Sequence, residues 1–303
     1  MKINLSGLIP AIVIPFQTDF SLDEETMRLY VQRISSCGIK GLAVNTDAGE
    51  GHFLLPEERK KIVVLAKEIV PDKVPVICGL GGATTFQAVE MAKEFKDLGV
   101  DCFLVFPHPA FRGGGNNKDK VVINYHQQIA RVGIPLIIFQ LQEELGGTHY
   151  GLETLAELTK IDEVVAIKEA SFDALEFKET VSFLNSLRKK IVILTGNDNF
   201  IPESFLLGAN GALIGFGAIF TEIQVEVINL LQTKRYNQAL ALFDKISEIC
   251  RYCFRAPVRD YRARIKEVLV AQGIFKTSLV RPPLLPLSKK EREEIRTLIQ
   301  LNN

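Results

Sequence analysis

A single lysine, Lys168, stands where a reactive side chain is expected. It directly follows residues 164–167, a short apolar run with the length and β-branched character of a buried strand. Burial at the end of such a strand disfavours the ammonium form and lowers the lysine pKa from about 10.4, which leaves more free amine to attack a carbonyl carbon. The alternative is a lysine that leaves the strand for solvent or forms an ion pair with Glu169.

A second candidate region is the loop over residues 45–51, which reads Asn-Thr-Asp-Ala-Gly-Glu-Gly. Its small residues allow backbone N–H groups to converge on an anionic group of a ligand. The same composition is also typical of a simple turn. We expect Glu50 to be a structural anchor that accepts hydrogen bonds from neighbouring loops, in preference to a direct part in catalysis.

A fold must bring these residues together, and the sequence indicates which one. Short apolar runs alternate along the chain with stretches of helical periodicity. The alternation is typical of a parallel sheet covered by helices, and eight strands make a (β/α)₈ (TIM) barrel. The active site of such a barrel lies where its strands end, so Lys168 and the loop share one rim. The strands are expected at residues 11–14, 41–44, 74–78, 102–106, 136–139, 164–167, 191–194 and 212–214.

Helix signals lie between the strands. Ser21 with Glu24 predicts a capping box, and Pro56 suits the first turn of a helix that continues to residue 69. After about residue 233 the strand pattern stops and amphipathic helical stretches follow. We therefore expect a catalytic barrel over residues 1–232 and a C-terminal helical region over residues 233–303.

Composition narrows the class of function. The 303 residues are 47% hydrophobic and carry no net charge, which predicts small-molecule chemistry without nucleic acid or membrane partners. Five cysteines, an odd number, indicate a reducing compartment, so we expect a cytoplasmic protein. The four histidines show no ligand spacing, and the Cys250/Cys253 pair has no second pair beside it, so no metal site is expected.

Several segments together resemble the dihydrodipicolinate synthase and N-acetylneuraminate lyase family. The similarity extends over nearly the whole chain. Residues 167–171, Ile-Lys-Glu-Ala-Ser, are similar to the segment that carries the family's Schiff-base lysine. The other similar segments are residues 10–16, 47–50, 76–79, 195–198 and 208–211.

Members of that family are class I lyases, in which a lysine amine condenses with the 2-oxo group of pyruvate or a longer 2-oxo acid. The iminium then acts as an electron sink for making or breaking a C–C bond, or for dehydration. The resemblance implies that Lys168 forms the imine with a small-molecule carbonyl substrate, that no cofactor is needed, and that the chain forms a homo-oligomer, a dimer or a tetramer. The residues expected to bind substrate are Ala48, Gly49, Phe139, Gln140, Asn197 and Leu213.

Proton transfer is where this chain departs from the family. Phe139 replaces a tyrosine that relays protons, and it has no hydroxyl. Asp47 and Ala48 replace two threonines, so Ala48 keeps only its backbone N–H for a substrate carboxylate. Asp47 could carry the proton, particularly if burial raises its pKa from about 3.9, or could be structural. His108 is a second acid–base candidate because imidazole titrates near neutrality, or it is held in a proline-rich turn.

The segment after the fifth strand limits the substrate. Residues 140–147 read Gln-Leu-Gln-Glu-Glu-Leu-Gly-Gly, where synthases of the family present an arginine to a substrate carboxylate. The glutamate carboxylates of this segment would repel an aldehyde that itself carries a carboxylate. This argues against dihydrodipicolinate synthesis itself. Gln140 could instead hydrogen-bond a substrate hydroxyl or carbonyl. We expect an aldolase or lyase acting on a 2-oxo acid such as pyruvate, or a dehydratase of a deoxy-oxo sugar acid. The alternative is a catalytically altered barrel that binds a small molecule or has a regulatory role.

Overall fold

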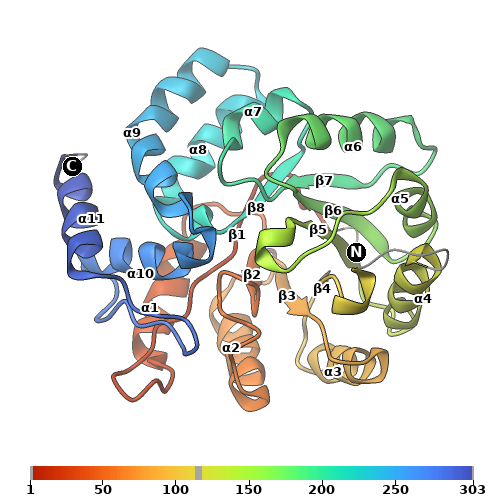
Figure 1. The fold of residues 1–303 in the computed structure, drawn as a ribbon, viewed down its shortest axis with the longest axis horizontal. Helices are drawn as coiled ribbons and strands as arrows, with labels where there is room; N and C mark the ends of the chain where they lie inside the picture. Colours follow the sequence, from red (N-terminus) through yellow and green to blue (C-terminus); the bar gives the residue numbers. More distant parts are fainter. Residues whose placement is uncertain (1–2, 113–117, 302–303) are drawn as a thin grey trace.

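Eight parallel strands form one sheet in the computed structural model, which describes residues 3–112 and 118–301. Neighbours in the chain pair from β2 to β8, and β8 pairs with β1. A bridge between Ala11 and Ala43 brings β1 to β2 and nearly closes the barrel (Figure 1). The strands are β1 (Leu8–Pro10), β2 (Leu42–Val44), β3 (Val76–Leu80), β4 (Cys102–Val105), β5 (Leu136–Leu141), β6 (Val164–Ala170), β7 (Val192–Thr195) and β8 (Gly211–Ile214).

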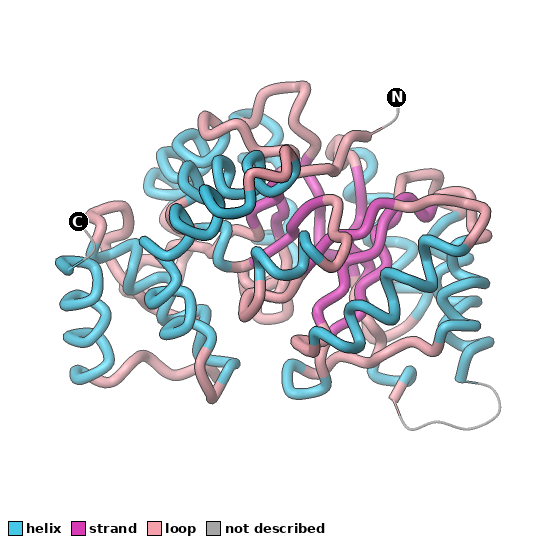
Figure 2. Tube along the Cα trace, turned by 90° about the horizontal axis from the view of Figure 1, so that it is seen from above, coloured by secondary structure: helices cyan, strands magenta, loops and turns pink. Residues whose placement is uncertain are grey.

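Helices separate consecutive strands and cover the outside of the sheet (Figure 2). The predicted TIM barrel with a C-terminal helical extension is therefore confirmed. The helices of the barrel are α1 (Glu24–Ser35), α2 (Pro56–Ile69), α3 (Thr85–Asp97), α4 (Lys118–Ala130), α5 (Leu152–Thr159), α6 (Ala174–Ser186), α7 (Ile201–Leu206) and α8 (Thr221–Gln232). The extension contains α9 (Tyr236–Phe254), α10 (Tyr261–Ala271) and α11 (Lys289–Leu301).

The first strand and the first helix begin at positions other than those expected. Strand β1 ends at Pro10, and the expected residues 11–14 continue its pairing only as isolated contacts, such as the hydrogen bond from Ile12 N to Ala43 O at 3.1 Å. The cap of α1 is Asp23, whose carboxylate accepts from the N–H of Thr26 at 3.1 Å. The capping box predicted at Ser21 is wrong, because Ser21 bonds to the Asp19 carboxylate instead.

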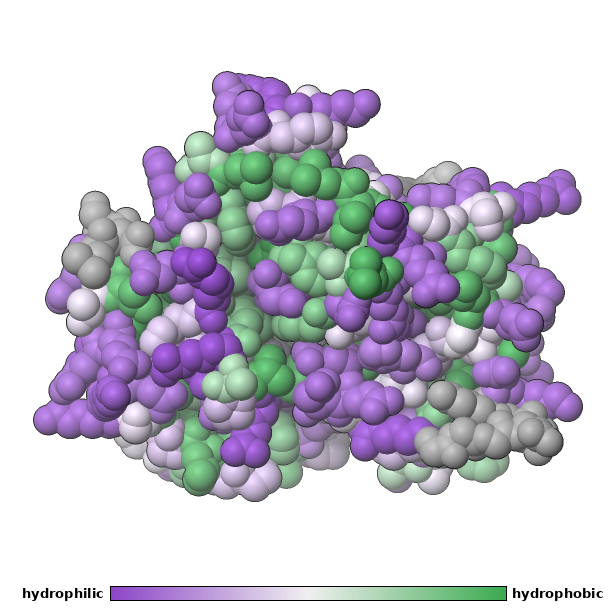
Figure 3. All heavy atoms as spheres, turned by 45° about the horizontal axis from the view of Figure 1, so that its top comes forward, coloured by the Kyte–Doolittle hydropathy of each residue, from purple (hydrophilic) through white to green (hydrophobic). Residues whose placement is uncertain are grey.

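The core lies between the sheet and its helices and inside the barrel. All residues of β3 and β5 are buried, as expected for strands whose two faces are both covered. On the face shown in Figure 3, hydrophilic residues predominate and hydrophobic residues form smaller groups between them. Within residues 3–112 and 118–301, no helix has the length and apolar composition needed to cross a membrane.

The C-terminal helices pack against one side of the barrel, with α10 nearest the strands (Figure 1). Helix α9 packs on α8 through a small apolar cluster of Val227, Leu230, Leu231 and Ala239. This packing joins the extension to the barrel. The division between residues 232 and 233 falls between α8 and α9, and it remains a prediction.

Candidate active site

Lys168 lies in β6 and its side chain is buried, with 7% of its surface exposed. Its Nζ atom is 4.2 Å from the centre of the Phe139 ring, on the neighbouring strand β5. It does not pair with Glu169, whose carboxylate accepts from Asn197 and from the backbone of Ser171. Both alternatives weighed for this lysine, a solvent position and an ion pair with Glu169, are therefore excluded.

Burial lowers the pKa of Lys168 to about 8, and the negative charges of Asp198 and Asp47 partly oppose that effect. The direction agrees with the expectation from the sequence, and so does its main cause. A lysine with such a pKa has a substantial fraction of free amine near neutral pH. Lys168 thus has the electrostatic environment of a nucleophile.

Asp198, in the loop after β7, is a site residue that the sequence argument missed. It is 95% buried, since only 5% of its surface is exposed, and its Oδ1 accepts from the N–H of Phe216 at 2.7 Å. Burial raises the pKa of Asp198 to about 7, although that hydrogen bond and the charge of Lys168 act in the opposite direction. The sequence did contain a signal for Asp198. It lies directly beyond a strand end, as Asn197 does, and a carboxylate at that position is as good a candidate for the barrel mouth as an amide.

That neighbour, Asn197, was expected to bind substrate, but its polar atoms are already used within the protein. Its Nδ2 donates to Glu169 Oε2 at 2.7 Å, and its Oδ1 accepts from the N–H of Phe172 at 2.7 Å. Gln140 is similarly engaged, donating to Glu169 and Glu176. In this arrangement both amides link neighbouring strand ends, and their expected contact with substrate remains a prediction.

Asp47, in the loop after β2, is held by two residues of α10. Arg262 forms an ion pair with its carboxylate, and the Arg262 Nε donates to the Asp47 carbonyl at 2.7 Å. The Tyr261 hydroxyl donates to Asp47 Oδ2 at 2.8 Å. Burial alone would raise the pKa of Asp47, but the Arg262 charge and these hydrogen bonds lower it. The raised pKa considered for Asp47 is therefore wrong, and the carboxylate is its resting form.

Tyr261 and Arg262 could not be found by inspecting strand ends. They lie more than 200 positions beyond Asp47, in the helical extension, and no local motif links them to the barrel rim. Both side chains are buried. The extension therefore contributes side chains to the barrel mouth.

The loop after β2 also offers unpaired donors. Among the described residues, neither the N–H of Ala48 nor that of Gly49 is the donor of a backbone hydrogen bond. Thr46 is buried, and within the same residues its hydroxyl has no partner. A Cβ at position 49 would lie 2.9 Å from the carbonyl oxygen of Ile12, so the loop approaches the segment just beyond β1 as closely as glycine permits. Together these groups can donate hydrogen bonds to an anionic or carbonyl oxygen.

One apolar side chain contacts the lysine directly. The Phe139 ring lies 4.2 Å from the Lys168 Nζ, contacts Phe106 edge to face with ring centres 5.1 Å apart, and supplies no hydroxyl. An aromatic ring beside the amine excludes water from that side, which strengthens the charge interactions of Lys168. Leu213, in β8, is fully buried and pairs in register with Ile9 of β1, and its expected contact with substrate remains a prediction.

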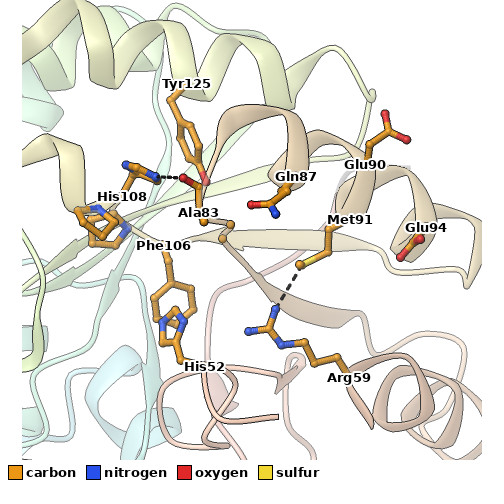
Figure 4. Close-up of a pocket in the computed structure, with 14 residues that line it drawn as sticks. His52, Arg59, Ala83, Gln87, Glu90, Met91, Glu94, Phe106, His108 and Tyr125 are labelled. Atoms are coloured by element: carbon orange, nitrogen blue, oxygen red, sulfur yellow. Dashed lines mark hydrogen bonds between the residues drawn. The ribbon is translucent and has the colours of Figure 1, made fainter. Parts of the chain in front are cut away.

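His108 lies in a neighbouring pocket of about 550 Å³. Its Nε2 lies 3.1 Å from the carbonyl of Ala83 and its Nδ1 accepts from the N–H of Ala110, so both ring nitrogens are engaged. Phe106 and His52 line this pocket together with His108, and their rings lie edge to face 4.8 Å apart (Figure 4). The Phe106 ring also contacts Phe139. The contacts fit the alternative of a histidine held in a turn, and they give the predicted acid–base role no link to Lys168.

Glu50 has the contacts of a structural anchor. Its carboxylate forms an ion pair with Lys266 of α10, and both side chains are fully buried. The other oxygen accepts from the N–H of Arg281 at 2.7 Å. Lys266 also donates to the carbonyl of Leu279 at 2.7 Å. The loop after β2 is therefore fixed to the extension at a second point.

Known proteins share this architecture over their full length. An uncharacterized DapA-like lyase of Pyrococcus abyssi is 24% identical over 98% of both chains. A 4-hydroxy-tetrahydrodipicolinate synthase of Methanothrix thermoacetophila is 27% identical, covering 97% of this chain and 95% of its own. The dihydrodipicolinate synthase of Acinetobacter baumannii, solved with pyruvate, is 26% identical and superposes with a TM-score of 0.87 over 99% of each chain. The profile of the dihydrodipicolinate synthetase family matches residues 4–302, and the chain belongs to that family.

Proposed function

We propose that this protein is a class I lyase in which the Lys168 amine forms an imine with a carbonyl substrate. The observation that carries the proposal is the buried Lys168, with a pKa of about 8, at the carboxyl end of β6. The family of the chain and the DapA-like lyase among its relatives support the class. The reaction is aldol cleavage or addition next to a 2-oxo acid such as pyruvate, or dehydration of a deoxy-oxo sugar acid.

The two buried carboxylates suit different roles because their surroundings shift their pKa values in opposite directions. Lys168 adds to the carbonyl carbon, and a proton passes from nitrogen to oxygen to give a carbinolamine. Asp198 in its neutral form then gives a proton to the carbinolamine hydroxyl, which leaves as water as the C=N bond forms. Asp198 becomes a carboxylate beside the new positive charge, which it stabilises.

The free N–H groups of Ala48 and Gly49 are the place for the substrate carboxylate, as a 2-oxo acid requires. Synthesis of dihydrodipicolinate is a poorer fit. The short helical turn Glu143–Leu145 after β5 presents two exposed carboxylates, which would repel an acidic aldehyde. We propose that the second carbonyl partner carries no charge on the part that faces this turn. The homo-oligomeric state and cytoplasmic location expected from the resemblance remain predictions.

Borohydride reduction in the presence of carbonyl compounds tests the proposal. Parent protein is treated with pyruvate, longer 2-oxo acids and simple aldehydes in parallel, and each sample is weighed intact by mass spectrometry. An adduct with pyruvate supports a pyruvate lyase. An adduct with another carbonyl compound, but none with pyruvate, means that the substrate belongs to the class of that compound. If no compound is trapped, the protein is not an imine-forming enzyme, and the reading as a small-molecule-binding or regulatory barrel takes its place.

The pH dependence of trapping gives a further prediction. Imine formation needs free Lys168 amine, which increases as pH rises through about 8, and neutral Asp198, which decreases as pH rises through about 7. We expect a bell-shaped rate with its maximum between these values. In Asp198→Asn the alkaline limb should disappear, and the acid limb should move to lower pH because a charge that raises the Lys168 pKa is gone. Stopped reactions at a series of pH values measure both limbs, and an acid limb that moves to higher pH contradicts the assignment.

A further inference from the structure

The proposed chemistry requires a proton carrier at the carbon next to the imine, and Phe139, whose ring contacts Lys168, has no hydroxyl to act as one. Phe139 presents only its ring, 4.2 Å from the Lys168 Nζ. Asp198 is used to expel water from the carbinolamine. A group that removes and returns the carbon-bound proton must therefore come from another part of the mouth.

Tyr261 brings a hydroxyl to this region from the first turn of α10. The ring stacks on Phe254 with centres 5.0 Å apart and planes at 21°, which fixes its orientation. Both rings lie against Gly215, just beyond β8, where an added Cβ would be 3.1 Å from the Tyr261 ring and 3.4 Å from the Phe254 ring. Tyr261 is thus wedged beside the carboxyl end of β8, with 5% of its surface exposed.

The hydroxyl of Tyr261 is connected to the lysine through shared neighbours. It donates to Asp47 Oδ2 at 2.8 Å, and Asp47 is one of the two carboxylates whose charge raises the pKa of Lys168. Burial raises the pKa of Tyr261, and the charges of Asp47 and Asp198 act in the same direction. The same two carboxyl groups therefore lie within electrostatic reach of both the Lys168 amine and the Tyr261 hydroxyl.

We propose that the Tyr261 hydroxyl relays protons between the carbon next to the imine and the Asp47 carboxylate. The inference rests on the proposed imine chemistry, and it places in the helical extension the hydroxyl that β5 lacks. Arg262 is a positioning residue in this arrangement. It binds both the carboxylate and the backbone carbonyl of Asp47, and it keeps the carboxylate ionised so that it can accept the proton.

The step balances without a free phenolate. The iminium loses a proton from the adjacent carbon to the Tyr261 oxygen, while the original phenolic proton passes to Asp47. The C–H electron pair forms the C=C bond of the enamine, and the iminium electron pair returns to nitrogen. Positive iminium and negative carboxylate both become neutral, and the reverse sequence returns the proton to the carbon.

The experiment compares parent protein and Tyr261→Phe, which keeps the ring and its stacking. Two quantities are measured with the carbonyl compound that the parent traps, pyruvate first: the borohydride adduct by mass, and exchange of the protons next to its carbonyl in D₂O by NMR. We expect the adduct to persist and the exchange rate to fall by about 10²- to 10⁴-fold, the range typical of general acid–base groups. Tyr30→Phe is the control, because that buried hydroxyl donates at 3.0 Å to the carbonyl of Ala218, away from the lysine.

A second variant keeps the test decisive. In the double variant Phe139→Tyr/Tyr261→Phe the hydroxyl returns to β5, beside Lys168, and we expect partial recovery of exchange. Exchange at the parent rate in Tyr261→Phe overturns the relay. A fall of equal size in Tyr30→Phe also overturns it, since loss of any buried hydroxyl would then suffice. If the parent itself traps no carbonyl compound, the proposed function fails first and this inference fails with it.

Discussion

Replacing Lys168 by arginine is expected to lower turnover by roughly 10⁴-fold or more, because the guanidinium stays protonated and cannot form an imine. The substitution keeps a positive charge within electrostatic reach of Asp47 and Asp198, so the electrostatic balance of the mouth is largely preserved. Turnover of the carbonyl compound that the parent traps is the measurement, with circular dichroism to verify the fold. A neutral substitution would remove the nucleophile and the charge together, and could not separate the two effects.

The matched control is Lys189→Arg. Burial also lowers the pKa of Lys189, but its Nζ donates to the carbonyl of Ile161, outside the site. We expect this variant to keep its activity within about twofold, as surface changes away from a site usually do. Comparable losses in both variants, or normal turnover in Lys168→Arg, would show that the chemistry does not depend on an amine at position 168.

Replacing Lys266 by methionine is expected to destabilise the protein by about 3–5 kcal/mol, since it leaves the Glu50 carboxylate buried without its partner. Methionine is unbranched and fits the space along Phe16, over whose ring the Lys266 amine lies at 4.3 Å. The measurement is the free energy of unfolding from urea titration.

The double variant Glu50→Gln/Lys266→Met should recover part of that loss, because the uncompensated charge is gone. Lys93→Met serves as the control, since Lys93 pairs with Glu90 on the surface and such pairs contribute about 1 kcal/mol or less. Unfolding of Lys266→Met at the urea concentration of the parent would mean that the buried pair does not stabilise the fold.

The fold could be predicted because its signals are local and repeated. Each strand is a short apolar run between helical stretches, and the positions of β4 and β6 to β8 agree with the sequence to within a few residues. The end of β1 at Pro10 could not be predicted from the apolar pattern. Pro10 is apolar and fits that pattern, but it has no N–H to donate to a neighbouring strand. Element type followed from periodicity, and boundaries depended on single hydrogen bonds.

The site was only partly predictable, because burial and long-range pairing decide how its residues behave. Lys168 was chosen as a candidate for its place directly after an apolar run, and the structure places it within β6. Asp47 was identified too, but the sign of its pKa shift depends on Arg262, 215 positions away. Asn197 and Asp198 are adjacent and equally polar in the sequence, and only the structure shows that Asn197 holds Glu169 while Asp198 acts on Lys168.

The location of the imine tests the account most directly, because the residues that the structure describes include two buried lysines whose pKa burial lowers to about 8, Lys168 and Lys266. Parent protein is reduced with borohydride in the presence of pyruvate and the carbonyl panel, digested, and the modified peptide is sequenced by mass spectrometry. We predict that the adduct lies on Lys168, at the barrel mouth, and that Lys266, paired with Glu50, stays unmodified. An adduct on Lys266 or any other lysine, with Lys168 unmodified, would contradict the account.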